Sequence, residues 1–170
     1  VQSMCYSAVR DDCWHLALGC RGKIKIMEAS TPLVFGDDIT VLANLDKSKG
    51  VGSRDVVTCV KYSGSMNSRG NCYLAAGLSS GSIVVYEAPI NGHENAYEVK
   101  AKFKGHSGPV LHLDFSKQSG GDAEHLQSNC SRFELRFWNI KQGKEVKAAS
   151  EMRNEKWESL TCPLSWSALG

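Results

Sequence analysis

Three residues whose side chains act together in hydrolases lie near one another in the sequence, namely His106, Ser107 and Asp114. In such enzymes a histidine takes the proton of a nucleophilic serine while a carboxylate orients the imidazole. These residues lack the glycine pattern that presents a nucleophilic serine on a sharp turn, and the glycines of an oxyanion hole. A histidine hydrogen-bonded within its own structural repeat is therefore the favoured interpretation, and no catalytic residue is predicted.

Two further groups contain residue types that bind metals or cofactors. Cys13, His15 and Cys20 carry zinc-binding side chains, but their spacing does not match the paired-ligand patterns of zinc sites. His15 is instead expected to point outward from a strand. Residues 50–53, Gly-Val-Gly-Ser, lack the third glycine of a dinucleotide-binding loop, and no P-loop lysine follows them. We therefore predict no metal site, no cofactor, no small-molecule substrate and no enzymatic activity.

A basic stretch between residues 46 and 69 is the remaining candidate for binding. Its cations are Lys47, Lys49, Arg54, Lys61 and Arg69. Only two aspartates oppose these five cations, so the local net charge is +3. Most of the stretch has the composition of a loop, and a basic loop can attract an acidic protein surface. The alternative is an ordinary solvated loop without a partner.

The composition is that of a globular domain without a strongly charged surface. The chain has 170 residues, 42% of them hydrophobic and 22% charged, which allows one ordinary domain or part of a larger one. The net charge of +2 gives no field strong enough to direct binding to nucleic acid or to a membrane. No apolar run approaches the roughly 18 residues that a membrane-spanning helix needs. Residues 1–22 lack the basic start and apolar core of a signal peptide.

The cysteines point to a reducing compartment. There are seven, an odd number, and no Cys-x-x-Cys pair occurs. Most lie in apolar stretches, where a free cysteine behaves as a small hydrophobic residue. Reduced thiols in a cytosolic protein are therefore expected. The first residue is valine rather than methionine, so Val1 is not expected to be the natural start.

The sequence contains an internal repeat that predicts β-hairpins, so we expect strands and their turns to position these candidate residues. Each copy reads as a short strand, a tight polar turn and a second strand, and the copies are 16–29, 74–88 and 126–140. A further strand is expected before each hairpin, at 5–9, 56–62 and 111–115, with the clearest apolar–polar alternation in the last. A fourth strand is expected after each hairpin, at 39–45, 97–103 and 145–149.

The connections between these strands are polar and contain glycine, so they are expected to be loops, at 46–54, 63–71 and 116–124. One helix competes with the strand assignment. Residues 145–160 have good helix propensity but no consistent apolar face. A helix there is the less favoured alternative.

Four-stranded units that repeat in this way are typical of a β-propeller. A small sheet with two apolar faces cannot bury both alone, and radial stacking of several sheets buries them. We therefore predict an all-β fold, a partial β-propeller with about three blades and the start of a fourth. The blade-like units are expected at approximately 1–50, 51–103 and 104–150, with 151–170 beginning the next blade.

The number of units is too small for a closed ring. Propellers usually have about four to eight blades, so this chain is expected to be a portion of a longer protein. A β-sandwich is the alternative architecture, and it explains the internal repeat less well.

The third unit resembles a WD40 repeat. Gly105 and His106 precede the strand at 111–115, and Trp138 lies near the end of the following hairpin. In WD40 blades the histidine, a strand hydroxyl, a turn aspartate and the tryptophan form a buried hydrogen-bond network. The turn aspartate is missing here. Its place is taken by Arg21, Ser80 and Arg132 (or Ser131). The networks are therefore expected to be incomplete, and Glu134 and Arg136 are expected to pair their charges on a strand face.

A longer ordered series resembles the echinoderm microtubule-associated protein-like family. The series begins with Gly-His-Ser at 105–107 and the strand containing Asp114, and it continues through Ser128-Asn129 to Trp138. It ends in a Trp-x-x-x-Thr-Cys-x-Leu stretch that starts at Trp157 and includes Cys162. The resemblance is good over 56–164 and loose over 1–55. Arg132, where the family has aspartate, and the insertion at 120–122 depart from the family pattern.

The resemblance implies a non-catalytic scaffold that binds tubulin and microtubules, within a pair of joined propellers. It implies a place in the cytoplasm and cytoskeleton, with the ciliary axoneme as one such place, and other cytoskeletal or axonemal proteins as partners. Nucleic acid, membranes and small molecules are not expected as partners. The residues expected to form the structural repeat signature are Gly105, His106, Asp114, Trp138, Trp157 and Cys162.

The basic stretch then becomes the candidate tubulin contact, because the surface and tails of tubulin are acidic. The alternative function is that of a general WD40 adaptor, which joins other proteins without binding tubulin directly.

Overall fold

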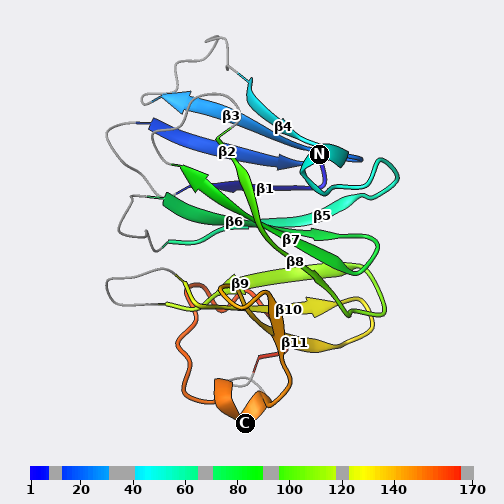
Figure 1. The fold of residues 1–170 in the computed structure, drawn as a ribbon, viewed down its shortest axis with the longest axis vertical. Coiled ribbons are helices and arrows are strands. Elements are labelled where there is room, and N and C mark those ends of the chain that lie inside the picture. Colours follow the sequence, from blue (N-terminus) through cyan, green and yellow to red (C-terminus); the bar gives the residue numbers. More distant parts are fainter. Residues whose placement is uncertain (8–12, 31–40, 65–70, 90–95, 118–122, 166–170) are drawn as a thin grey trace.

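The computed structural model describes residues 1–7, 13–30, 41–64, 71–89, 96–117 and 123–165. These residues form three four-stranded antiparallel sheets, stacked along the longest axis of the molecule (Figure 1). The first sheet contains β1 (Ser3–Tyr6), β2 (Cys13–Gly19), β3 (Ile24–Ser30) and β4 (Val41–Leu45). The second contains β5 (Val57–Tyr62), β6 (Asn71–Leu78), β7 (Ser82–Pro89) and β8 (Glu98–Lys104). The third contains β9 (Val110–Phe115), β10 (His125–Cys130), β11 (Leu135–Asn139) and β12 (Lys144–Val146).

Each strand pairs with its neighbours in sequence, so every sheet is a meander. The central hairpin of each sheet is the one that the internal repeat predicts, and the pairing of β2–β3, β6–β7 and β10–β11 confirms it. Glycine makes two of the turns possible: Gly22 has φ 72° and Gly81 has φ 79°. Only glycine adopts such angles at little steric cost.

Apolar residues fill the two spaces between the sheets. The layer between the first and second sheets includes Ile24, Ile26, Leu74 and Tyr86. The layer between the second and third includes Phe115 and Trp138, among other residues. Fully burying one large apolar side chain contributes about 1.5–3 kcal/mol, so stacking is what makes these small sheets stable.

The first strands of the three sheets lie next to one another. Val60 on β5 donates its backbone N–H to Ser3 Oγ on β1, at 3.1 Å. The hydroxyl of Thr58, also on β5, donates to the backbone oxygen of Val110 on β9. Strands that meet along one side while the sheets fan outward are the blades of a propeller. The fold is therefore all-β and a partial β-propeller, as predicted.

The fourth strand expected at 145–149 forms as β12, which pairs with β11 but ends at Val146. The helix expected as the alternative at 145–160 does not form: the chain after β12 is mostly irregular and contains only a short 3-10 helix, η2 (Ala149–Met152). Met152 and Trp157 pack on Phe137, on the outer face of the third sheet. A helix over 145–160 would have no consistent apolar face to pack on the sheet, and the few apolar residues of the segment pack singly instead.

Residues 157–165 run back along β9. Trp157 makes an isolated bridge to Ser116. Further along, the Thr161 hydroxyl donates to the backbone oxygen of Leu113 at 3.0 Å, and the backbone N–H of Leu164 donates to Asn129 Oδ1 at 2.9 Å. No helix among the described residues has the length and hydropathy to span a bilayer.

Candidate functional site

The residues of the WD40-like repeat meet in one buried network at the third sheet. His106 is 7% exposed, and its Nε2 lies 2.7 Å from Ser128 Oγ on β10. Trp138 on β11 donates its indole N–H to the same Ser128 oxygen at 2.8 Å. The ionised carboxylate of Glu134 can only accept, so Nδ1 of His106 carries the hydrogen and donates to Oε2 at 3.0 Å. Nε2 of the neutral imidazole is then the acceptor, and the Ser128 hydroxyl donates to it.

Glu134 completes this network, so the prediction that it is incomplete is wrong for the third unit. The carboxylate of Glu134 also accepts hydrogen bonds from Ser107, at 3.0 Å from its backbone nitrogen and 2.7 Å from its hydroxyl. Glu134 lies two residues after Arg132, which stands where the family has aspartate. Glu134 is the last residue before β11, and its carboxylate is the acidic group that His106 contacts in this unit.

The environment holds both groups in a defined charge state. The hydrogen bonds from Ser107 lower the pKa of Glu134 from its ordinary 4.5 to about 2. Burial lowers the pKa of His106 below its ordinary 6.5, against the opposing effect of Glu134. A neutral imidazole beside an ionised carboxylate follows. Arg136 extends the cluster and lies 2.7 Å from Glu145 and 3.5 Å from Glu134, which is the charge pairing expected on this strand face.

The geometry gives no hydrolase triad. The Ser107 hydroxyl is bound to Glu134, while both nitrogens of His106 contact Ser128 and Glu134. Asp114 is fully buried and accepts from the backbone and hydroxyl of Ser159, the latter at 2.7 Å. His106 and Ser107 therefore share the carboxylate of Glu134, and Asp114 serves a separate structural contact.

One cluster in the described part of the chain has donor atoms spaced as metal ligands would be. It comprises His106, Cys130 and Glu134, whose ligand atoms lie within 4.8 Å of one another. Each of these atoms already takes part in a hydrogen bond: the Cys130 thiol donates to Glu134 Oε2 at 3.4 Å, beside the contact from His106. A metal ion would have to displace this network, and we assign the cluster to the fold.

His15 is buried, so the expectation that it points outward is wrong. It is 4% exposed, and its Nδ1 lies 2.7 Å from the hydroxyl of Tyr97, which in turn lies 2.8 Å from the hydroxyl of Tyr62. This polar chain joins the first and second sheets. Burial lowers the pKa of His15. Alternation along β2 decides the orientation, because the inward face of that strand meets the second sheet and not solvent.

The other residues of the repeat signature pack in the third sheet. Gly105 lies against the ring of Trp138, where an added Cβ would be 3.1 Å from Cη2. Trp138 stacks on Phe103 with ring centres 4.9 Å apart. Trp157 stacks on Phe137 at 5.8 Å. Cys162 is buried with its sulfur 3.8 Å from the backbone oxygen of Gln127.

The structure describes four of the five cations proposed as a contact, and these four do not all lie together. Lys47 and Lys49 are on a short 3-10 helix, η1 (Lys47–Lys49), and Arg54 is exposed in the turns that follow. Lys61 lies in β5, where its ammonium group donates to Ser159 Oγ at 2.9 Å. Arg69 lies outside the described residues. The loop after β4 therefore holds three of the candidates.

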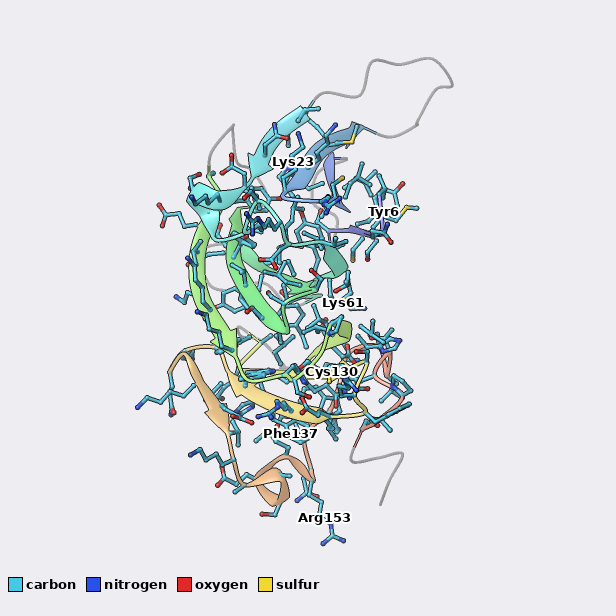
Figure 2. The ribbon with its side chains drawn as sticks, turned by 90° about the vertical axis from the view of Figure 1, so that its right-hand side faces the viewer. Tyr6, Lys23, Lys61, Cys130, Phe137 and Arg153 are labelled. Atoms are coloured by element: carbon cyan, nitrogen blue, oxygen red, sulfur yellow. The ribbon has the colours of Figure 1, made fainter. Side chains whose placement is uncertain are left out.

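The strand order gathers other cations beside these three. The connections β2–β3, β4–β5, β6–β7, β8–β9 and β10–β11 all lie at the same end of the sheets. We call this end the turn face: residues 20–23, 46–56, 79–81, 105–109 and 131–134, with the adjoining strand ends. It is at the right of Figure 1 and faces the viewer in Figure 2, where Lys23 is labelled. Its cations are Arg21, Lys23, Lys47, Lys49, Arg54, Lys102, Lys104 and Arg132.

Sequence reasoning missed several of these residues. Arg21, Lys102 and Arg132 are far apart in the chain, and only the stacking of hairpins brings their ends to one face. Among the described residues, none of these eight cations has a carboxylate oxygen within 4.0 Å, whereas Arg136, at the start of β11 beside Gly105, pairs with Glu134 and Glu145. The sequence signal that points to them is the position of each cation at or next to a predicted turn.

Comparison with known proteins confirms the resemblance read from the sequence. The chain is 32% identical over 98 residues to echinoderm microtubule-associated protein-like 4 of Xenopus laevis and 30% identical over 99 residues to echinoderm microtubule-associated protein-like 3 of Homo sapiens. It is 31% identical over 98 residues to the 77 kDa echinoderm microtubule-associated protein of Lytechinus variegatus. These matches cover 57–58% of this chain but only 10–14% of those proteins. No family model matches the chain.

Solved structures confirm the fold. The C-terminal WD40 domain of Sif2 has a TM-score of 0.59 at 14% identity, covering 85% of this chain and 35% of that domain. Chaetomium thermophilum Sqt1, bound to the N-terminus of the ribosomal protein L10, has a TM-score of 0.59 at 23% identity, covering 85% of this chain and 32% of that one. The chain is thus part of a WD40-type propeller and is similar to microtubule-associated proteins.

Proposed function

We propose that this protein is a non-catalytic scaffold that binds microtubules, and that the loop after β4 contacts tubulin. The similarity to echinoderm microtubule-associated protein-like proteins carries the proposal. The buried network around His106 supports a structural use of the residues that could have been catalytic. WD40 propellers host many roles, so the fold supports a binding role without naming the partner.

The loop after β4 suits electrostatic binding because its lysines are presented on a short ordered helix. Asp46 caps η1 by accepting from the backbone N–H of Ser48 at 2.9 Å and from its hydroxyl at 2.8 Å. These hydrogen bonds lower the pKa of Asp46. Its carboxylate therefore holds the helix, and Lys47, Lys49 and Arg54 are left to face a partner. The acidic surface of tubulin is complementary to them.

Co-pelleting of the intact protein with polymerised tubulin across a salt series tests this proposal. We expect saturable binding that weakens as salt rises, because exposed charge pairs are screened. Substituting Lys47→Gln, Lys49→Gln and Arg54→Gln together should weaken binding severalfold and flatten its salt dependence. The matched control is Lys117→Gln, Lys141→Gln and Lys144→Gln, which removes three exposed charges at the opposite ends of the strands.

Two results would contradict parts of the proposal. Unchanged pelleting of the folded triple variant would remove the loop from the contact. No pelleting of the folded wild-type protein would instead favour the general adaptor role. We further propose a cytoskeletal location in the cytoplasm, with the ciliary axoneme as its narrower form. Imaging of the tagged protein in ciliated cells tests that location.

A further inference from the structure

A pocket opens at the centre of the turn face, beside the β6–β7 hairpin. It has a volume of about 340 Å³, and the polar side chains in its lining are those of Asp55, Ser80, Ser82, Lys102 and Lys104. Apolar atoms of Leu78, Ile83 and Phe103 line the rest of it. The pocket therefore offers cationic and hydroxyl groups around an apolar floor, in a region that the basic loop borders.

The two lysines of the pocket are exposed and lie on the same side of the edge strand β8. Lys102 and Lys104 are exposed, whereas Ala101 and Phe103 alternate with them and are buried. Alternate residues of a strand repeat at about 6.5–7 Å. Lys102 reaches over the loop: a Cβ added to Gly50 would be 2.7 Å from its Cε and 3.0 Å from its Nζ. Both lysines thus line the same pocket.

The turns on both sides make the pocket part of one continuous surface. A Cβ added to Gly22 would be 3.0 Å from the backbone oxygen of Ser53, which places the β2–β3 turn against the loop after β4. One added to Gly81 would clash with the backbone of His106, and one added to Gly108 would be 2.9 Å from Cγ of Arg132. The turns that carry the cations of the turn face are therefore in contact with one another, and they form one surface around the pocket.

The acidic groups on this face do not neutralise it. Asp46 and Glu134 are ionised, and with Asp55 they make three negative charges against the eight cations named above, so the face keeps a positive balance. Asp55 lines the pocket and is the remaining carboxylate of the turn face. Binding an anion here would pair ammonium groups that have no carboxylate within 4.0 Å in the described part of the chain.

We propose that the turn face binds an extended acidic peptide, with the carboxylates of alternate residues at Lys102 and Lys104. Alternate side chains of an extended peptide have the same spacing of about 6.5–7 Å as these two lysines. The apolar floor suits the methylene groups of glutamate. Single-stranded nucleic acid is less suited, because sites for it usually offer exposed aromatic rings for base stacking, and Phe103 is buried. The inference rests on the proposed function and names its ligand class: the acidic C-terminal tails of tubulin.

Fluorescence anisotropy with a labelled octaglutamate peptide and the intact protein tests the inference. We expect saturable binding at low salt, and no binding of an octaglutamine peptide of equal length. Lys102→Gln with Lys104→Gln should weaken octaglutamate binding at least fivefold. The control pair Lys117→Gln with Lys141→Gln should change it less than twofold. All four lysines are exposed, so the variants should fold, and a thermal melt checks this.

Three results would overturn the inference: no octaglutamate binding, equal loss in the two pairs, or equally tight, lysine-dependent binding of a single-stranded RNA. Pelleting with microtubules whose tails have been removed by proteolysis separates it from the proposed function. Equal pelleting with and without tails, and no peptide binding, would overturn the inference and leave the microtubule scaffold standing. Peptide binding without any pelleting would support the acidic-peptide site and contradict the scaffold.

Discussion

At the scale of single residues, Glu134 connects a loop, two strands and a histidine. Its carboxylate accepts from both polar groups of Ser107 and from His106, and each donor belongs to the loop before β9. The histidine in turn contacts Ser128 on β10, which binds Trp138 on β11. Glu134 therefore holds the loop between the second and third sheets, together with the contact of His106 to Ser128 and the backbone bond from Ser131 to Pro109.

Glu134→Gln should lower the free energy of unfolding at pH 7 by about 1–2 kcal/mol, because charge-assisted hydrogen bonds become neutral ones. The folded pKa of about 2 lies below the ordinary 4.5, so the stabilisation by Glu134 is complete above pH 4.5 and is lost as pH falls toward 2. Urea titrations should therefore show that the difference between wild type and variant shrinks in acid. A difference that is constant from pH 7 to pH 3 would contradict this assignment.

Phe133 occupies a turn position that the other two repeats give to glycine. Its φ is 59°, against 72° for Gly22 and 79° for Gly81, and it is 85% exposed. The left-handed region costs a bulky residue about 1–2 kcal/mol. The exposed ring makes little packing that could offset this cost.

Phe133→Gly should therefore raise the free energy of unfolding by about 0.5–1 kcal/mol, since relief of the strain exceeds the added freedom of the unfolded chain. Phe133→Ala is the matched control, because it removes the ring and keeps the strain, and it should not stabilise. Thermal and urea unfolding of the three proteins measure the effect. Equal stabilisation by both substitutions would attribute it to the ring instead.

At the scale of elements, the close approach of neighbouring sheets depends on a small residue in β6. A Cβ added to Gly77 would lie 2.5 Å from Cys59 Sγ and 2.8 Å from Cγ1 of Val110 on β9. Gly19 is its counterpart in the first sheet, where an added Cβ would be 2.8 Å from Cγ1 of Val57. In both sheets, a glycine in the second strand leaves room for the first strand of the next sheet.

Gly77→Ala should lower the free energy of unfolding by about 1–3 kcal/mol, as overpacking of a close contact does. The expected readout is a lower midpoint in urea with an unchanged slope. Gly143→Ala is a contrasting control, because its Cβ would meet nothing within 4 Å and only its φ of 65° opposes the change. A neutral Gly77→Ala would mean that the second and third sheets are further apart than described.

The positions of the strands could be predicted from the sequence, because the patterns that mark them are local. Alternating apolar residues and polar turns are local patterns, and β6, β7 and β9 lie where those patterns place them. The conformation of residues 145–160 is harder to predict, because their helix propensity favours a helix while single apolar residues such as Trp157 pack on the sheet without one. Packing on the third sheet decided the outcome in favour of irregular chain.

At the scale of the whole molecule, a buried polar chain links the first two blades. His15, Tyr97 and Tyr62 form it across the layer between the sheets. Glu28 is the charged group that raises the pKa of His15, and burial outweighs it. A second buried histidine, His106, has a lowered pKa in the third blade. Both histidines are neutral in the folded protein at neutral pH.

We expect the protein to lose stability as pH falls below 6.5, the ordinary histidine pKa, because the unfolded chain then binds protons that the folded chain excludes. Each histidine contributes at most about 1.4 kcal/mol per pH unit. NMR titration of the imidazole resonances measures both pKa values directly. Folded pKa values at or above 6.5 for His15 and His106 would contradict the prediction.

The amino-acid sequence by itself determined the strands, the hairpin repeat and the propeller, because period-two alternation and turn residues act over a few neighbours. It also carried the resemblance to microtubule-associated proteins. The tertiary structure alone decided that Glu134 closes the network, that His15 is buried, and that Lys61 lies apart from Lys47. It also gathered Lys23, Lys102 and Arg132 on one face. These outcomes depend on which strand ends stacking brings together, and residues tens of positions apart carry no local signal of that contact.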